Sequence, residues 1–533
     1  MARMSGAQVL ADMLQGYGVT HVFMVPAVLR RTFAEMERRT SIHRIHTHGE
    51  KSAAYMADGY ARACGRPGVC MAQVVGALNL AAGLRDAWLA HSPVIALTGG
   101  RDARSKFRKV YQEVDDVPAF EPVTKFNATV DAVERFPDMI RQAFRVATSG
   151  APGPVHLQFR GNEGQIDQDE ADMEPLWEPG FARVPAFRPE PEPERVRQVL
   201  ELLHNAQRPV FVAGGGVRAS GASRELVALA EALGIPVATS LNAKDAIPAA
   251  HPLSVGVVGS YSRESANRVV AGADLVCFIG TEAGGMTTHA WKVPPVGTPA
   301  VQIDIDAEML GRNYPLAGAI LGDARATLAR LLEQADPASA ARRRDWVASA
   351  QSICREWYAR YSPLLESDAV PIRPERLCRE LSQHLPDDAL VLVDTGHAGM
   401  WMGGMYDLRA GQGYLRSAGH LGWAFPAGLG AKCALPGRPV VAFTGDAGFW
   451  YHIGELETAV RWRMNSVTVV NNNGGGNQSK RGFDRVYGGV QTEKARELWT
   501  YTKTNFARIA EDIGAVGLRV ERPADLAPAL RCR

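Results

Sequence analysis

The sequence predicts an α/β protein made of three doubly wound, parallel-sheet domains. Its 533 residues are too many for a single hydrophobic core. Short apolar runs alternate with helical segments from one end to the other, a pattern typical of parallel sheets covered by helices. A proline-rich stretch at 175–193 and a second junction at 336–346 interrupt this alternation. We therefore expect domains at residues 1–172, 190–335 and 365–533.

The first two domains contain apolar runs that we interpret as buried strands. In the first domain an amphipathic N-terminal helix precedes runs at 20–27, 68–76, 92–100 and 153–161. In the second domain a helix at 193–206 precedes runs at 208–216, 235–240, 274–280 and 299–306. Gly214, Gly216 and Ala219 fit a dinucleotide-binding pattern. The next strand ends without the acid that a NAD site needs, so a structural turn is favoured.

The third domain has runs at 389–396, 438–446 and 466–473, and polar residues stand where two of them end. Asp446 closes one strand, and Asn473 closes the next strand 27 residues later. Since neighbouring parallel strands end at the same edge of a sheet, we expect the two side chains to meet there. With the carbonyl of Gly475 they offer oxygen ligands that suit Mg²⁺ shared with a phosphate. For either residue alone, an Asp cap or an Asn-Gly turn is the alternative.

The composition argues against nucleic acid, structural zinc and a membrane as partners of this chain. Lys and Arg number 59 against 57 for Asp and Glu, so no charge pattern for nucleic acid or a membrane surface appears. The seven cysteines form no CxxC pair, which argues against structural zinc and for a reducing compartment. No apolar stretch approaches the ~20 residues that span a bilayer. We expect a cytoplasmic protein that binds neither nucleic acid nor membrane.

Gly-Asp-Ala at 445–447, followed by Asn-Asn at 472–473, resembles the signature of thiamine-diphosphate (ThDP) enzymes of the acetolactate synthase and pyruvate decarboxylase superfamily. The resemblance covers essentially the whole chain. Residues 48–69, HGEKSAAYMADGYARACGRPGV, are similar to the segment that carries the superfamily's glutamate. Residues 417–431, SAGHLGWAFPAGLGA, are similar to the segment that supports the bent cofactor.

The resemblance implies a role for each matching residue. Glu50 would face N1′ of the aminopyrimidine and share a proton with it, a task that suits a buried carboxyl. Leu421 would wedge between the two cofactor rings, and Gly422 would offer its carbonyl to the 4′-amine. The remaining expected cofactor contacts are Gly76, Gly396, His397, Asp446, Ala447, Gly448, Asn473, Gly475 and Gly476. Glu50 as a helix cap and His397 as a surface turn residue are the structural alternatives.

Glu50 and the expected metal ligands lie in different domains. The resemblance therefore implies active sites at a subunit interface, with a homodimer as the minimum and a homotetramer expected.

The reaction is predicted from residues around this core. Tyr111, Gln112 and Glu113 resemble an element near the thiazolium in 2-hydroxyacyl-CoA lyase and its relatives, so Gln112 is a candidate substrate contact. Ala27 leaves room for a branched acyl carbon. Glycines and cations at 480–489 suggest a mobile loop that closes on a CoA ester. Glu493 is the candidate acid and base within it, provided that water is excluded.

The leading hypothesis is a ThDP- and Mg²⁺-dependent carbon–carbon lyase that cleaves a 2-hydroxyacyl-CoA, for example 2-hydroxyisobutyryl-CoA, reversibly to formyl-CoA and a ketone or aldehyde. Asp304 and Asp323 resemble the region where CoA-ester enzymes hold ADP, which makes the central domain a candidate for ADP or a CoA moiety. The alternative is a 2-keto-acid carboligase or decarboxylase of the acetolactate synthase or oxalyl-CoA decarboxylase type. A non-catalytic assembly subunit is disfavoured, because Glu50, Asp446 and Asn473 are present together.

Overall fold

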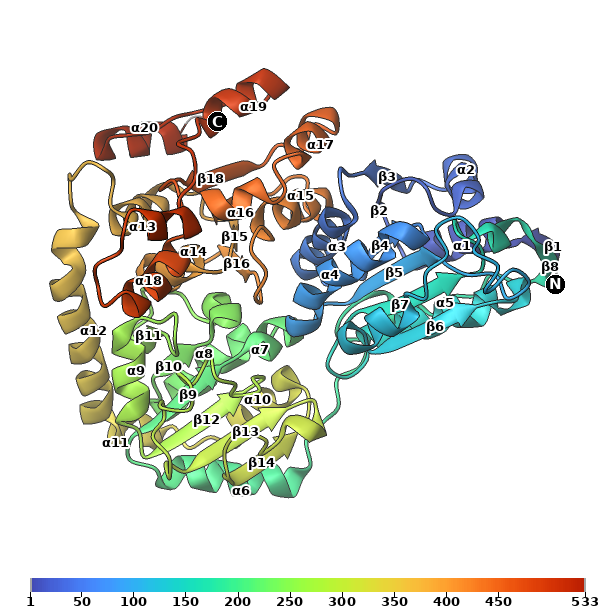
Figure 1. The fold of residues 1–533 in the computed structure, drawn as a ribbon. Helices are drawn as coiled ribbons and strands as arrows, with labels where there is room; N and C mark the ends of the chain where they lie inside the picture. Colours follow the sequence, from blue (N-terminus) through green and yellow to red (C-terminus); the bar gives the residue numbers. More distant parts are fainter. Residues whose placement is uncertain (1, 532–533) are drawn as a thin grey trace. The chain divides into compact units, whose positions relative to one another are not determined.

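A computed structural model describes residues 2–531 of the protein. Three parallel sheets and one short antiparallel pair make up its β-structure (Figure 1). The predicted α/β class with three parallel-sheet domains is confirmed. No helix among the described residues is both long and apolar enough to cross a membrane.

The first sheet has six parallel strands in the order β3-β2-β4-β5-β7-β6, blue to cyan in Figure 1. Its strands are β2 (His21–Met24), β3 (His43–His46), β4 (Gly68–Ala72), β5 (Val94–Gly99), β6 (Phe126–Val130) and β7 (Val155–Phe159). Its helices are α1 (Gly6–Gly16), α2 (Arg30–Arg39), α3 (Glu50–Cys64), α4 (Ala77–Leu89) and α5 (Phe136–Thr148). The central strands β4, β5 and β7 are buried throughout, as expected for a parallel sheet covered by helices.

Two predicted elements of this domain are accompanied by structure that the sequence pattern did not show. The N-terminal helix α1 begins at Gly6, after β1 (Ala2–Ser5), which pairs antiparallel with β8 (Glu170–Met173). Ser5 caps α1 by accepting a hydrogen bond from Gln8. The predicted strand at 68–76 ends at Ala72 and continues as a 3₁₀ turn, η1 (Val74–Gly76). That turn lies near the expected catalytic glutamate.

The second sheet has six parallel strands in the order β11-β10-β9-β12-β13-β14. They are β9 (Pro209–Ala213), β10 (Val237–Thr239), β11 (Ser254–Val257), β12 (Leu275–Ile279), β13 (Ala300–Asp304) and β14 (Leu316–Leu321). The helices are α6 (Pro193–Asn205), α7 (Gly215–Ser220), α8 (Ser223–Leu233), α9 (Glu264–Ala271), α10 (Ala324–Glu333), α11 (Ala338–Arg342) and α12 (Arg344–Leu365). A Cβ on Gly214 would lie 2.1 Å from the carbonyl oxygen of Gly280, so backbone packing alone accounts for this glycine.

The third sheet has four strands in the order β16-β15-β17-β18. They are β15 (Leu390–Val393), β16 (Gly413–Arg416), β17 (Val440–Gly445) and β18 (Val467–Asn471). The helices of this part of the chain are α13 (Pro374–His384), α14 (His397–Met405), α15 (Ala424–Ala434), α16 (Asp446–Trp450), α17 (Glu455–Arg461), α18 (Asn477–Val486), α19 (Phe506–Ile513) and α20 (Leu526–Arg531).

The described residues form two compact units. The first comprises residues 2–187, 417–470 and 509–515, and the second comprises residues 188–416, 471–508 and 516–531. In the first unit, glycines bring α3 and α15 into backbone contact. A Cβ on Gly59 would lie 2.0 Å from the carbonyl oxygen of Ala427, and one on Gly430 would lie 1.9 Å from that of Met56. This packing joins the helix that starts at Glu50 to the segment that follows Gly422.

Candidate active site

Glu50 is the first residue of α3, and its carboxylate lies against the η1 turn. Asn79 Nδ2 donates a hydrogen bond to Glu50 Oε2 at 3.2 Å. A Cβ on Gly76 would lie 2.3 Å from Glu50 Oε1, so only glycine allows this approach. The side chain is half-buried rather than buried, which differs from the expectation. One carboxylate oxygen is thus fixed by an amide, and the other lies at the backbone of the turn.

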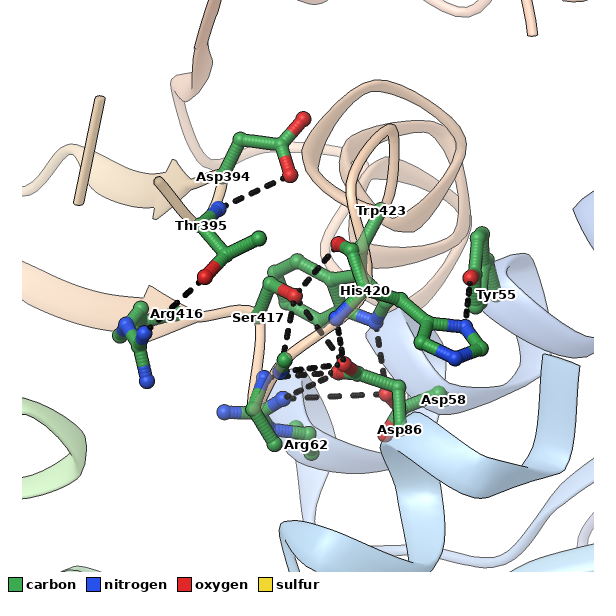
Figure 2. A network of polar contacts seen from close by, with 12 residues as sticks. Tyr55, Asp58, Arg62, Asp86, Asp394, Thr395, Arg416, Ser417, His420 and Trp423 are labelled. Carbon is green, nitrogen blue, oxygen red and sulfur yellow. Dashed lines mark hydrogen bonds and ion pairs between the residues drawn. The ribbon is translucent and has the colours of Figure 1, made fainter. Parts of the chain in front are cut away.

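The segment 417–420, just before Leu421, is fixed by one buried carboxylate, Asp86 of α4. The backbone N–H groups of Ala418, Gly419 and His420 each donate to this carboxylate at 3.0 Å (Figure 2). The Ser417 hydroxyl also lies 3.0 Å from it. Three consecutive amides on one anion define the conformation of the turn, and hydrogen bonds to a charged acceptor are stronger than neutral ones.

A second buried carboxylate holds the far end of this turn. Trp423 Nε1 donates to Asp58 Oδ2 at 2.7 Å (Figure 2). The Arg62 guanidinium lies 3.7 Å from Asp58 and 4.8 Å from the Trp423 ring centroid. Burial raises the pKa of Asp58 despite the charge of Arg62. Between these anchors, Leu421 is 41% exposed and Gly422 adopts a φ of +85°, which favours glycine.

Gly422 contacts the start of α16, where Asp446 lies. A Cβ on Gly422 would lie 2.8 Å from the carbonyl oxygen of Gly448. Asp446 is the first residue of α16 and is only 3% exposed, so its carboxylate is held at the end of β17. Ala447 is half-buried and Gly448 is buried. The first compact unit therefore contains Glu50, Gly76, Leu421, Gly422 and the 446–448 turn of the expected cofactor site.

The remaining expected cofactor residues lie in the second compact unit. Gly396, with a φ of +68°, precedes His397, the first residue of α14. Burial and the nearby Arg481 guanidinium lower the pKa of His397, so the imidazole is neutral at pH 7. Thr395 Oγ1 accepts a hydrogen bond from the buried Arg416 at 3.2 Å. A neutral histidine at a helix start, with two arginines nearby, suits recognition of a phosphate group.

The 473–476 turn is held by a second strand-like segment. Gly476 N–H donates to the carbonyl oxygen of Trp499 at 2.7 Å, and Gly475 forms a β-bridge with Thr500. Asn473 Oδ1 accepts from Gly475 N–H at 3.1 Å. A Cβ on Gly475 would lie 2.5 Å from the Trp499 oxygen, so this position requires glycine. The amide oxygen of Asn473 is thereby oriented within its own turn.

Two predicted catalytic residues lie in loops or at their ends. Gln112 is half-buried in the loop after β5 and has a φ of +63°. Glu493 is exposed, and its expected role requires that water be excluded from its carboxylate. The predicted mobile loop begins as a regular helix, α18, in which Lys480 pairs with Asp484 at 2.7 Å.

The acids that suggested ADP in the central domain stabilise local structure. Asp323 caps α10 by accepting hydrogen bonds from the backbone N–H groups of Arg325 and Ala326. It also forms an ion pair with Arg188 at 2.9 Å. Asp304 accepts a hydrogen bond from the backbone of Asp306. These contacts account for both carboxylates without a bound nucleotide.

Comparison with known proteins identifies the family. Models described as the N-terminal TPP binding, central and C-terminal TPP binding domains of thiamine pyrophosphate enzymes match residues 4–119, 196–331 and 394–532. A probable acetolactate synthase large subunit of Methanocaldococcus jannaschii is 30% identical over 539 residues, covering 99% of this chain and 89% of that protein. The chain belongs to the thiamine pyrophosphate enzymes.

Further relatives of this ThDP enzyme show the same full-length similarity. The acetolactate synthase large subunit of Corynebacterium glutamicum is 30% identical over 539 residues, which cover 99% of this chain and 84% of that protein. A glyoxylate carboligase of Escherichia coli O157:H7 is 30% identical over 547 residues, which cover 99% of this chain and 90% of that protein. The similarity includes synthases and a carboligase, and it does not support the 2-hydroxyacyl-CoA lyase, the CoA-ester substrate or the ADP or CoA site.

The residues of the first compact unit fit ThDP. The contacts of Gly76 with Glu50 and of Gly422 with Gly448 leave no room for a side chain at either turn. These turns present backbone groups, which is how proteins approach a flat ring or a phosphate closely. Glu50 offers the one carboxylate oxygen that Asn79 does not bind. The ThDP enzyme therefore has, on one unit, a carboxylate and two glycine turns suited to an aminopyrimidine.

Sequence reasoning missed several residues that build this site. Asp86 and Asp58 hold the 417–423 turn, yet each is a single acid inside a helical apolar segment. His452 and Ser52 hydrogen-bond each other next to Gly422, and His420 hydrogen-bonds Tyr55. A single charged residue in an otherwise apolar stretch of helix, such as Asp58 in AAYMADGYA at 53–61, was the available signal.

Proposed function

We propose that this ThDP enzyme is a Mg²⁺-dependent carboligase that acts on 2-keto acids, of the acetolactate synthase type. The observation that carries the proposal is full-length similarity to acetolactate synthases and to a glyoxylate carboligase. The site geometry is compatible with it, because the Glu50 carboxylate at the start of α3 lies against the Gly76 turn, and a second glycine turn, at Gly422, lies against Gly448. Bound ThDP supplies a thiazolium ring that stabilises negative charge on the carbonyl carbon of the substrate.

The residues of this chain bind, orient and exchange protons around that ring. Glu50 holds a proton at N1′ of the aminopyrimidine, and the Asn79 amide keeps its carboxylate from rotating. Leu421, exposed on a turn that Asp86 fixes, would contact bound ThDP between its two rings. The carbonyl of Gly422 would accept a hydrogen bond from the 4′-amine. Gln112 remains a proposed substrate contact from the loop after β5.

Mg²⁺ is proposed to bind Asp446, Asn473 and the carbonyl of Gly475. The set consists of one carboxylate, one amide oxygen and one backbone oxygen, the hard ligands that Mg²⁺ takes beside a phosphate. Among residues 2–531, no group of three or more His, Cys, Asp and Glu side chains forms a candidate metal site. Gly396, His397, Ala447, Gly448 and Gly476 are proposed to bind the diphosphate.

The lyase hypothesis has less support than the carboligase. Its proposed acid and base, Glu493, is exposed. At an exposed carboxylate, water competes with Glu493 as the proton donor to the carbanion. None of the three relatives compared with this chain has a name that mentions a CoA ester. We propose a homodimer or homotetramer as the working form, with active sites at the subunit interface.

The test is to identify the product. Protein with ThDP and Mg²⁺ is incubated separately with pyruvate, with glyoxylate and with 2-hydroxyisobutyryl-CoA. The proposal expects CO₂ release and a new carbon–carbon bond with one or both 2-keto acids, and no formyl-CoA from the thioester. Formyl-CoA from the thioester without turnover of either keto acid would overturn the carboligase in favour of the lyase.

A further inference from the structure

His452 is a buried histidine of the first compact unit that no role described above uses. It follows α16 in sequence and is 9% exposed. Its Nδ1 lies 2.7 Å from the hydroxyl oxygen of Ser52, two residues after Glu50 in α3. The ring packs edge to face against the Tyr55 ring, with centroids 5.3 Å apart. The imidazole is therefore held by the hydrogen bond at Nδ1 and by packing against Tyr55.

The other nitrogen of this ring, Nε2, is buried and has no hydrogen-bond partner among the described residues. A buried polar atom without a partner costs about 1–3 kcal/mol, and such atoms are rare in folded proteins. In a site built to bind a ligand, an atom of this kind is expected to pair with the ligand. The unpaired Nε2 is thus an observation that points to a missing partner.

The geometry places this nitrogen at the Gly422 turn. A Cβ on Gly422 would lie 2.9 Å from His452 Cδ2, the ring carbon bonded to Nε2. The same Cβ would lie 2.8 Å from the oxygen of Gly448. The Nε2 edge of the ring therefore faces the turn whose glycine is expected to contact the aminopyrimidine.

The surroundings keep the ring neutral and oriented. Burial, then the charge of Lys51, lowers the pKa of His452 to about 4, so the imidazole has one N–H and one lone pair at pH 7. The hydrogen bond between Ser52 and His452 Nδ1 and the packing against Tyr55 fix the orientation of the ring. Nε2 is left for a neutral hydrogen bond.

We propose that His452 is a cofactor-binding residue whose Nε2 forms a hydrogen bond with the head group of ThDP bound at the Gly422 turn. The partner is a polar atom of the aminopyrimidine, the part of ThDP that carries hydrogen-bonding nitrogens. Ser52 is a positioning residue, because it acts only through the orientation of His452. The inference depends on the cofactor and is independent of which 2-keto acid the enzyme uses.

Two substitutions of His452 distinguish the contribution of Nδ1 from that of Nε2. In His452→Asn the amide can replace Nδ1 and keep the contact with Ser52, but nothing reaches the position of Nε2. In His452→Gln the longer amide can replace Nε2. Cofactor-free protein is titrated calorimetrically with ThDP in excess Mg²⁺. We expect the Kd of His452→Asn to rise about tenfold, the effect of one buried hydrogen bond, and that of His452→Gln to stay within about threefold of the unchanged protein.

Any other order of affinities overturns the proposal. Equal Kd values for all three proteins would mean that Nε2 has no partner in the complex, and weak binding by His452→Gln alone would assign the effect to Nδ1. If His452→Asn does not fold, as judged by its melting curve, His452→Phe is compared with Ser52→Ala. Weak binding by the first and near-normal binding by the second supports the proposal, and the reverse contradicts it.

Discussion

At the scale of single residues, the site depends on how closely a few atoms approach. Glu50 has one oxygen fixed by Asn79 and the other beside Gly76. Gly422 occupies a left-handed conformation against Gly448. A Cβ at either glycine would lie too close to its neighbouring atom for the present conformation to persist. Substitutions of one or a few atoms at these positions therefore test chemistry without removing a large part of the core.

Glu50→Gln removes the exchangeable proton and keeps an oxygen that can accept from Asn79. We expect kcat to fall by about 100-fold or more, the usual contribution of a positioned acid or base, with little change in melting temperature. Steady-state kinetics and a thermal melt measure both. The matched control is Glu37→Gln, an exposed acid paired with Arg44, which should retain full activity. Full activity of Glu50→Gln would remove the carboxylate from the mechanism.

Gly76→Ala places a Cβ 2.3 Å from Glu50 Oε1. Because that oxygen is the end of a flexible side chain, the carboxylate should rotate away while the backbone stays in place. We expect activity to fall about tenfold or more, since small displacements of a catalytic group are costly, and the melting temperature to change little. Gly437→Ala, where no atom lies within 4 Å, is the control. Equal activity of the two variants would contradict the close approach.

At the scale of elements, the 417–423 turn and the loop after β5 are each held by a buried acid. Asp86 fixes the turn that carries Leu421. Asp116, buried at the end of the loop that carries Gln112, accepts a hydrogen bond from Gln158 Nε2 at 2.6 Å. The two acids differ in how well they are paired. Asp86 receives several donors, whereas one oxygen of Asp116 has no partner among residues 2–531.

Asp86→Asn should destabilise the turn. An amide cannot accept from three backbone N–H groups, because one of its two ends is itself a donor. We expect a loss of about 2–4 kcal/mol and weaker binding of ThDP. Thermal melting and calorimetric titration measure these effects, and Asp172→Asn, an exposed acid, is the control. An unchanged Asp86→Asn protein would mean that the carboxylate does not hold the turn.

Asp116 should make stability depend on pH. Burial raises its pKa to about 6, above the ordinary value of 3.8. The folded state therefore binds more protons than the unfolded state between those values, and this contribution to stability falls as pH rises from about 4 to about 6. Asp116→Asn keeps the acceptor for Gln158 and removes the charge. The variant should melt higher than the unchanged protein at pH 8, with no difference near pH 4.

At the scale of the whole molecule, the strands predicted from the sequence and the strands missed differ in position within the sheets. The runs at 92–100, 274–280 and 389–396 were found because central parallel strands are apolar on both faces. The strands missed in the three parallel sheets are all edge strands, namely β3, β6, β11, β14 and β16, although one edge strand, β18, was predicted. An edge strand has one neighbour and can be partly polar, as HRIH in β3 shows, so its hydrophobic pattern is a weaker signal.

The residues of the candidate site also fall into those that the sequence predicts and those that it does not. Glu50 and Asp446 were found because short motifs mark them, and the structure places them at the start of α3 and at the end of β17. The supporting residues Asp86, Ser52 and His452 were not found, since each acts through a contact more than 300 residues away in sequence. Glu493 stays a prediction, because charge in a loop does not reveal whether its carboxylate is shielded from water.

The proposed oligomer can be tested through the exposed apolar residues of η1 and α4. Val75, Leu78 and Leu89 are 46–49% exposed, and we propose that they contribute to the subunit interface. We expect light scattering to give at least twice the mass of the 57.6-kDa chain. Leu78→Lys should shift the species toward the monomer at low concentration. A monomer for the unchanged protein would contradict the proposed oligomer.

The central claim, that this ThDP enzyme joins two 2-keto acids, is tested most directly by carbon NMR. The holoenzyme is incubated with pyruvate and glyoxylate, both labelled with ¹³C at C2. Carboligation bonds the C2 of the donor, after loss of CO₂, to the C2 of the acceptor. We expect product signals split by one-bond ¹³C–¹³C coupling. Product signals without that splitting, or no reaction of either acid, would contradict it.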